Sequence, residues 1–427
     1  MKVLMFGWEF PPHISGGLGT ACYGMVKGLI YHDVEVLFVT PKVFGDEDSE
    51  GFRLLDASDV DLTLSREEMD EIWSKMTMIG VGSYLVPYLS PEFFAQYSEE
   101  IMKDEKRIKE TVFQARFKFE GKYGKDLFEE VSRYGLIAGR VAQAETFDVI
   151  HAHDWMTYPA GIAAKQVSGK PLIVHVHATE FDRSGEHVNQ RVYDIERAGM
   201  HAADKIIAVS NRTRQVIIDR YGVHPDKVET VHNAVMTLPE QQKPERWIND
   251  KIVTFLGRIT FQKGPDYFVE AAAMVLKEMK NVRFVMAGSG DMLEKMIMLA
   301  AKHRIGDRFH FTGFLKGQEV SDLFNMSDVY VMPSVSEPFG ISPLEAMQSR
   351  VPVIISKQSG VSEILNHAIK TDFWDVEAIA DAIYALLNYK GISTMFIRHA
   401  REEVEALKWD QVGYKVNNVY QQLLLTD

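Results

Sequence analysis

The stretch VYVMPSVSEPFGISPLEAM, residues 329–347, contains the signals of a buried strand, a loop and a helix start in succession. Its first four residues, 329–332, are apolar and rich in β-branched and aromatic side chains, so they predict a buried strand that ends at Pro333. After the loop, Ser342 is expected to be the N-cap of a helix and Pro343 its first residue. A strand that leads through a loop into a helix is the unit from which parallel α/β sheets are built.

The loop before this predicted helix combines backbone donors with two carboxylates. The amides around Gly340 and Ile341 would point towards the end of the strand, and free amides at a helix start bind phosphate oxygens. Glu337 and Glu345 flank these amides. Because carboxylates repel a phosphate, we expect both to accept hydrogen bonds from hydroxyl groups, and hydroxyls beside phosphates indicate a nucleotide sugar. The alternative is that Glu337 is a solvated loop charge and Glu345 only complements the helix dipole.

Length and composition bound the class of protein. At 427 residues the chain is too long for one compact core, which predicts two or three domains. Its 46% hydrophobic and 25% charged residues are typical of a soluble globular protein, and a formal net charge of -13 disfavours nucleic acid and anionic membranes as partners. No apolar stretch is long enough to span a bilayer and the start of the chain lacks a secretory signal, so we expect a cytoplasmic protein.

The single cysteine, Cys22, restricts the chemistry that sulfur can provide. One cysteine excludes an intrachain disulfide and a metal site made of several cysteines. Cys22 falls in a predicted helix, where we expect a small buried hydrophobic residue and not a reactive thiol.

The beginning of the chain predicts a strand, a glycine loop and a helix. The apolar run 2–8 reads as a buried parallel strand, and the loop that follows contains Gly16 and Gly17 before a helical pattern through Leu29. Glycines there allow the backbone to approach an anion closely. The third glycine of the dinucleotide fingerprint is missing at its usual interval, so we do not predict NAD binding. A second strand over 34–40 completes the unit.

Two further predicted strands end in histidines. The segment that ends the first one carries His151 and His153 on one face, followed by Asp154, at the strand end where open parallel sheets keep their ligand groups. In the second, His175 is expected inside the core and His177 at the strand terminus. The histidine pair could indicate a metal, but no third ligand follows at a zinc-like spacing, so the sequence predicts no metal site.

The segment between these units is less regular. Residues 91–116 are highly charged with helical spacing. Most such runs are solvated helix faces with ion pairs four residues apart. Contact with an acceptor substrate is the alternative that we keep for this segment.

The second half of the chain repeats the strand and helix alternation after a polar stretch, 236–249, that contains two prolines and predicts a domain boundary. The fold class is therefore α/β, with a doubly wound sheet in each half. The strands expected in the second half are 251–257, 282–287, 308–311, 329–332 and 352–356.

The first of these strands ends in a pair of cations. Arg258 and Lys263 lie five positions apart, with glycines on both sides, and could converge on a diphosphate leaving group and stabilise its developing charge. The alternative is two unrelated surface cations. Gly288 belongs to another glycine turn before a helix and is expected to line a nucleotide pocket.

The segment from Glu337 to Glu345 resembles the two-glutamate signature of retaining glycosyltransferases of the GT-B architecture, the group that includes bacterial and archaeal glycogen synthases. Four further matches occur in order along the chain: the glycine loop, Asp154, His177, and the Arg258 and Lys263 pair. The resemblance implies a GT-B fold, with two Rossmann-like domains and an interdomain cleft. It also implies an acceptor domain over 1–240, joined by a crossover helix over 409–427, and a donor domain over 250–408.

The resemblance assigns roles to individual residues. It implies that Glu337 and His177 hold the donor sugar and that Glu345 holds the ribose. Asp154 would lie on the acceptor side, and Arg258 and Lys263 would offset the diphosphate charge. Donor binding is expected to involve a larger set: Gly16, Gly17, Gly288, Phe339, Gly340, Ile341 and Glu345.

The function implied is transfer of glucose, with retention of configuration, from ADP-glucose or UDP-glucose to an α-glucan, without a metal or other cofactor. Ile14 and Thr20 stand where glycogen synthases usually have lysine and aspartate, which favours the broader neighbouring family. The alternatives are therefore a transferase that makes another glycoside or a surface polysaccharide, a nucleotide-sugar epimerase, and a noncatalytic glucan-binding relative.

Overall fold

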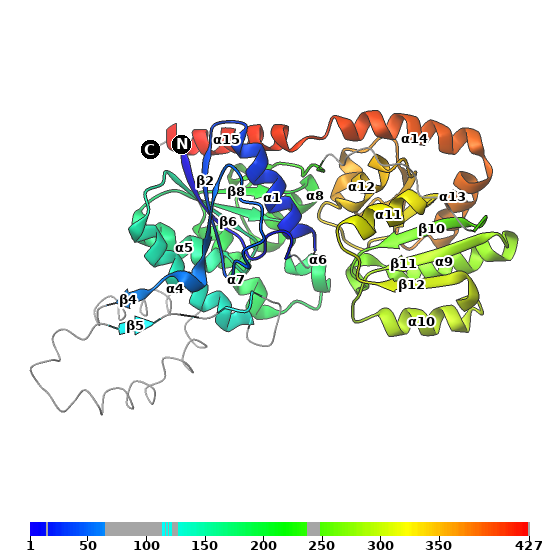
Figure 1. Cartoon of the computed structure of the whole chain (residues 1–427), viewed down its shortest axis with the longest axis horizontal. Helices are drawn as coiled ribbons and strands as arrows, with labels where there is room; N and C mark the ends of the chain where they lie inside the picture. Colours follow the sequence, from blue (N-terminus) through cyan, green and yellow to red (C-terminus); the bar gives the residue numbers. More distant parts are fainter. Residues whose placement is uncertain are drawn as a thin grey trace, which may run out of the picture.

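A computed structural model of the chain describes residues 1–13, 16–64, 113–115, 117, 119–121, 127–236 and 248–425. These residues form two Rossmann-like α/β domains that lie side by side (Figure 1). Three sequence features lie outside the described residues: Ile14, nearly all of the charged stretch 91–116, and most of the predicted boundary 236–249.

The first domain is built on a parallel sheet of seven strands in the order β3-β2-β1-β6-β7-β8-β9. The strands are β1 (Lys2–Phe6), β2 (Glu35–Thr40), β3 (Arg53–Asp56), β6 (Val149–His153), β7 (Leu172–Val176), β8 (Lys205–Ala208) and β9 (Val228–Thr230). A separate antiparallel pair joins β4 (Leu62–Leu64) to β5 (Phe113–Ala115).

Helices cover both faces of this sheet because successive strand residues point in opposite directions. On β1, Leu4 and Phe6 pack into a core with α4 and α5, whereas Val3 and Met5 pack into a core with α1 and the C-terminal helix α15. The helices are α1 (Gly17–Ile30), α4 (Leu127–Ala144), α5 (Tyr158–Ser168), α6 (Glu180–Ser184), α7 (Gln190–Ala202), α8 (Asn211–Tyr221) and α15 (Trp409–Leu425).

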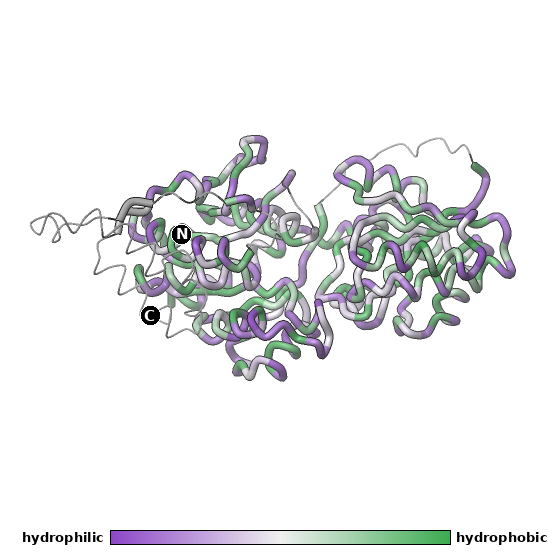
Figure 2. The backbone as a smooth tube through the Cα atoms, turned by 90° about the horizontal axis from the view of Figure 1, so that it is seen from below, coloured by the Kyte–Doolittle hydropathy of each residue, from purple (hydrophilic) through white to green (hydrophobic). Residues whose placement is uncertain are grey.

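The second domain has a parallel sheet of six strands in the order β12-β11-β10-β13-β14-β15. The strands are β10 (Lys251–Leu256), β11 (Val282–Ala287), β12 (Phe309–Gly313), β13 (Val329–Met332), β14 (Val353–Ser356) and β15 (Ile369–Thr371). The helices are α9 (Pro265–Glu278), α10 (Leu293–Lys302), α11 (Gln318–Met326), α12 (Ser342–Gln348), α13 (Val376–Asn388) and α14 (Lys390–Glu405). Hydrophobic segments run through the interior of each domain, with hydrophilic segments mainly around them (Figure 2).

The last helix, α15, returns from the second domain to the first and lies beside α1 (Figure 1). Three glycines make this contact close. A Cβ on Gly28 would come within 2.1 Å of the Trp409 carbonyl oxygen, and a Cβ on Gly413 within 2.2 Å of the Gly28 carbonyl carbon. Gly24 lies against the Trp409 ring in the same way. The predicted crossover segment 409–427 corresponds to α15, which covers residues 409–425.

The predicted strand 329–332 is confirmed, but the helix after it begins differently from the prediction. Ser342 is the first residue of α12 and not its N-cap, which is Ile341, and no side chain caps the helix. Proline is therefore the second helical residue, a position where its missing N–H has no partner to lose. Among the described residues, no helix is both long enough and apolar enough to cross a bilayer.

Candidate active site

In each sheet the strand order reverses between two neighbouring strands, and this is where open α/β sheets bind ligands at their carboxyl ends. In the first sheet the reversal lies between β1 and β6, and in the second between β10 and β13. The predicted residues follow these strands or their neighbours: Gly16 and Gly17 after β1, Asp154 after β6, His177 after β7, Arg258 and Lys263 after β10, Gly288 after β11, and Glu337 after β13.

Asp154 shapes the end of the first sheet. Its backbone has a φ of 60°, which a residue other than glycine rarely adopts, and its side chain is buried. The carboxylate Oδ1 accepts hydrogen bonds from the backbone amides of His177, at 2.7 Å, and Ala178, at 3.3 Å. Burial raises the pKa of Asp154 to about 6, although the positive charge of Arg183 and these amide bonds oppose the shift. Asp154 thus holds the turn that carries His177.

Four histidines lie side by side on β6, on β7 and directly after β7. His153 and His175 are register partners in the parallel pair, and the rings of His151 and His153 stack at 4.3 Å between centroids, as do those of His175 and His177 at 4.4 Å. His153 Nδ1 lies 3.0 Å from His177 Nε2. Desolvation lowers the pKa of all four rings, to about 3 for His151 and His177, so the rings are neutral at physiological pH.

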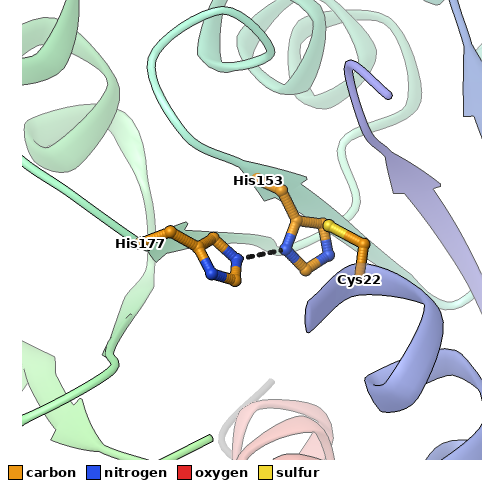
Figure 3. A group of neighbouring side chains, drawn as sticks. All are labelled: Cys22, His153 and His177. Carbon is orange, nitrogen blue, oxygen red and sulfur yellow. Dashed lines mark hydrogen bonds between the residues drawn. The ribbon is translucent and has the colours of Figure 1, made fainter. Parts of the chain in front are cut away.

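Cys22, from α1, lies against this histidine group (Figure 3). It is fully buried, as predicted for a small hydrophobic residue. Cys22, His153 and His177 each offer one potential ligand atom, and these atoms lie within 4.8 Å of one another. Cys22 is thus a third potential metal ligand beside the two histidines. Sequence spacing could not reveal it because it lies on a helix and the histidines lie at strand ends.

Arg258, Lys263 and Glu337 lie together at the end of the second sheet. Lys263, the last residue of the 3₁₀ turn η4 (Phe261–Lys263), forms an ion pair with Glu337. Arg258 Nη2 donates to Gln262 Oε1 at 3.1 Å, and the Gln262 carbonyl oxygen accepts from the Val335 amide at 2.9 Å. The loops after β10 and β13 are therefore tied to each other, and the cations are not scattered over unrelated surfaces.

Glu337 is only 6% exposed, so its charge requires partners. Besides the Lys263 ammonium, its Oε2 accepts a hydrogen bond from Ser334 Oγ at 3.2 Å. Its backbone carbonyl accepts the Gly360 amide at 2.9 Å and its own amide donates to the Gln358 carbonyl oxygen at 3.0 Å. The backbone and the side chain of Glu337 are thus both held in place before any ligand binds.

The glycines predicted to bind the donor differ in whether the surrounding structure has room for a side chain. A Cβ on Gly288 would lie 1.8 Å from the Gly257 carbonyl oxygen, and its φ of 139° also disfavours other residues. Gly16 and Gly17 are exposed, and a Cβ on either would meet nothing within 4 Å. Packing within the described residues therefore explains Gly288, whereas it gives no reason for Gly16 or Gly17.

The residues around the start of α12 divide into core and surface. Phe339 is 3% exposed and belongs to the core of the second domain, so its side chain does not face outward. The amides of Gly340 and Ile341 donate to no main-chain acceptor among the described residues. Glu345 lies in the first turn of α12, where desolvation raises its pKa to about 7.

The two groups of residues approach each other through a contact between the domains. Ser336, next to Glu337, donates from Oγ to Asp182 Oδ1 at 2.6 Å. Asp182 belongs to the capping box that starts α6 at Thr179, two residues after His177. In the same region, Phe261 of η4 lies 3.8 Å from the position of a Cβ on Gly185. The loop that carries Glu337 is therefore linked by two hydrogen-bonded residues to the turn that carries His177.

Comparison with known proteins agrees with this arrangement. Residues 239–403 match the family described as "Glycosyl transferases group 1", and residues 116–237 match "Glycosyltransferase Family 4". Both families consist of glycosyltransferases and their matches adjoin along the chain, so the chain is a glycosyltransferase. It has the GT-B fold.

Several relatives align with nearly the whole length of this glycosyltransferase. An uncharacterized glycosyltransferase of Methanocaldococcus jannaschii, MJ1607, is 28% identical over 98% of both chains. The glycogen synthase of Mycobacterium tuberculosis is 24% identical over 98% of this chain and 94% of its own. Among solved structures, Anabaena HepE in complex with UDP and glucose superposes with a TM-score of 0.66 at 15% identity, covering 99% of this chain and all of its own.

Sequence reasoning missed one charged cluster of this glycosyltransferase. Arg183, in α6, pairs with Glu180 and with the buried carboxylate of Glu196, which also accepts the Tyr221 hydroxyl. Desolvation raises the pKa of Glu196 to about 7 even though Arg183 opposes it. Spacing could not reveal the cluster because its members come from three helices. It fixes α6 behind His177.

Proposed function

We propose that this glycosyltransferase transfers glucose from a nucleoside diphosphate glucose, ADP-glucose or UDP-glucose, to an α-glucan with retention of configuration. The observation that carries the proposal is the group formed by Arg258, Lys263 and Glu337 at the reversal point of the second sheet. A diphosphate beside the two cations would place its sugar next to Glu337. The relatives and neighbours support this donor class, because they include a glycogen synthase and a protein bound to UDP and glucose.

In this proposal the leaving diphosphate is stabilised by cationic side chains and by the Gly340 and Ile341 amides, and no metal or other cofactor takes part. Lys263 already pairs with Glu337, so its positive charge is oriented before the donor arrives. Preorganised charge of this kind lowers a barrier by several kcal/mol because it needs no rearrangement during the reaction.

In this proposal, residues of the first domain would contact the donor sugar and the acceptor. His177 is neutral, so it can donate a hydrogen bond to a sugar hydroxyl without bringing a charge into the site. Asp154 would act through position, because its Oδ1 already accepts two backbone amides. That commitment disfavours Asp154 as a nucleophile, and we therefore prefer departure and attack on the same face of the sugar.

The experiment that tests the donor and acceptor is a screen of ADP-glucose, UDP-glucose and other donors against glycogen, maltooligosaccharides and simple sugars. An α-linked product from an α-linked donor supports retention. An epimerised donor in the absence of acceptor would indicate an epimerase, and no turnover of any donor would indicate a noncatalytic glucan-binding protein. A product with a simple sugar alone would favour synthesis of another glycoside.

The role of the cations is tested with Arg258→Ala. We expect kcat to fall by about 10²–10³-fold with a smaller change in the donor KM, because the charge that Arg258 offsets is greatest in the transition state. Arg283→Ala is the matched control, since Arg283 lies near the opposite end of its strand and pairs with Asp250. An unchanged kcat in Arg258→Ala would remove this residue from the mechanism.

A further inference from the structure

Three side chains that are unrelated in sequence converge beside the first sheet. Cys22 comes from α1, His153 is the last residue of β6, and His177 follows β7. Their potential ligand atoms lie within 4.8 Å of one another. Figure 3 shows the Cys22 side chain against the His153 ring, with His177 on the other side of that ring. Cys22 and His153 are fully buried, and His177 is partly exposed.

The residue types determine which ion would fit. One thiolate with two imidazoles is a ligand set typical of zinc and other thiophilic ions and not of magnesium or calcium, which prefer oxygen. The 3.0 Å between His153 Nδ1 and His177 Nε2 is close to the separation of about 3.3 Å that two nitrogens have around tetrahedral zinc. Three protein ligands leave a fourth position open, as in zinc sites that bind a further small molecule.

The surrounding charge favours a cation. Two buried carboxylates, Asp154 and Glu9, lie near Cys22, whose thiol must lose its proton when it binds a metal. The same two carboxylates would stabilise a divalent cation that displaces this proton. Neutralisation of the thiolate by the ion then removes the cost of burying it.

We propose that Cys22, His153 and His177 form a binding site for a thiophilic divalent cation, with Zn²⁺ as the expected ion, and that its occupation inhibits glucose transfer. The first part rests on the geometry alone. The second part rests on the proposed function, in which His177 holds the donor sugar. A metal bound to His177 takes this side chain away from the sugar, so inhibition is competitive with the donor. The ion enters from the side of His177.

The binding test is a titration of the full-length reduced protein with Co²⁺, a spectroscopic substitute for Zn²⁺. Because Cys22 is the only cysteine in the chain, a thiolate-to-cobalt charge-transfer band reports this site and no other. We expect one equivalent of Co²⁺ to produce the band and Zn²⁺ to abolish it. The band should be absent in Cys22→Ser. In His177→Ala the affinity for Co²⁺ should fall at least tenfold. This variant should fold, because position 177 is partly exposed.

Two other groups of potential ligands provide the controls. His13, Asp46 and Glu47 form an exposed group, and His151 and His175 form a buried group with His153. His13→Ala should bind Co²⁺ with unchanged affinity. Binding without a thiolate band, or equal binding by the parent protein and Cys22→Ser, would place the ion at one of these groups and overturn the proposal, as would the absence of binding.

The activity test compares initial rates with and without Zn²⁺ within each variant. In the parent protein, Zn²⁺ should raise the apparent donor KM. In Cys22→Ser, the ratio of the donor KM with Zn²⁺ to the donor KM without Zn²⁺ should be one. If the cobalt band forms but Zn²⁺ leaves the rate unchanged, the inhibitory half of the proposal is wrong while the metal site stands. If Zn²⁺ inhibits without competition with the donor, the role of His177 in donor binding fails instead.

Discussion

Glycine at two positions serves two different physical needs, although both were predicted to bind the donor. At Gly288 the protein itself excludes a side chain, because a Cβ would lie 1.8 Å from the Gly257 carbonyl oxygen. At Gly17 the space around the backbone is open and the residue is the first of α1. Only an approaching ligand would need that space. The two positions therefore separate a glycine kept for folding from one that would be kept for binding.

This difference predicts opposite results for the same substitution. Gly17→Ala should leave the free energy of unfolding unchanged or raise it by up to about 1 kcal/mol, since alanine favours helix, but it should raise the donor KM. Gly288→Ala should lower the free energy of unfolding by about 1–3 kcal/mol through overpacking. Denaturant unfolding and donor kinetics on both variants check this. A Gly17→Ala enzyme with an unchanged donor KM would show that the donor does not approach this loop.

Glu345 provides a pH-dependent prediction. Desolvation raises its pKa to about 7, so the carboxyl is largely protonated below that pH in the free protein. If Glu345 accepts ribose hydroxyls in its ionised form, donor binding must release its proton. The donor KM should then fall about tenfold as the pH rises from 6 to 8, because the ionised fraction rises by that factor. Glu345→Gln should raise the donor KM and remove its dependence on pH. If the donor KM of this variant still changed with pH as it does in the parent, the effect would belong to another group.

At the scale of secondary structure, the contact between α1 and α15 ties the end of the chain to its beginning. The two helices approach so closely that Gly28 and Gly413 face each other backbone to backbone, and Trp409 covers Gly24. Such proximity is possible only with small residues at the crossing point. The contact matters for function because α1 begins with the glycine loop and carries Cys22.

Gly28→Ala should therefore weaken the whole first domain. The new methyl group would lie 2.1 Å from the Trp409 carbonyl oxygen, which must move, and we expect a loss of about 1–3 kcal/mol in the free energy of unfolding. Gly391→Ala is the matched control, since Gly391 lies in α14 with nothing within 4 Å, and should gain up to about 1 kcal/mol. Chemical denaturation measures both. Equal stability of Gly28→Ala and the parent would mean that α15 does not pack in this way in solution.

Elements differ in how far the sequence predicted them. Buried parallel strands such as β13 are continuous apolar runs, so both the strand and the polar residues after its end could be recognised. The edge strands β3 and β15 are short, largely unburied and interrupted by charged residues, so no continuous apolar run marks them. The position of Cys22 beside His153 was also unpredictable, because periodicity shows which side chains face inward but not which ones meet across layers.

In the whole molecule, the two domains are joined by specific polar contacts besides the returning helix. The Glu363 carboxylate, in the 3₁₀ turn η6 (Gly360–Glu363) of the second domain, accepts the backbone amides of Asn211 and Arg212 at 2.9 and 2.8 Å. These amides begin α8 of the first domain, so a negative charge there also interacts favourably with the helix dipole. His232 Nε2 lies 2.8 Å from the same carboxylate. Close to the predicted site, Ser336 and Asp182 make a second link.

Loss of the Glu363 charge should loosen the two domains relative to each other. We expect Glu363→Gln to have a larger radius of gyration than the parent in donor-free solution at neutral pH, with unchanged circular dichroism, because the largest core of each domain lies within that domain. Glu377→Gln, which alters an exposed carboxylate at the start of α13, is the control and should scatter like the parent. Small-angle X-ray scattering makes the comparison.

The pH dependence of this contact follows from the sign of the shift at Glu363. Hydrogen bonds from His232 and from the α8 amides lower its pKa against the opposing effect of burial. A lowered carboxyl pKa stabilises the folded arrangement above the ordinary pKa, and this contribution is lost only as the pH falls through the lowered value. The radius of gyration of the parent should therefore stay constant from pH 7 to 5, and separation of the domains within that range would show that another group holds them together.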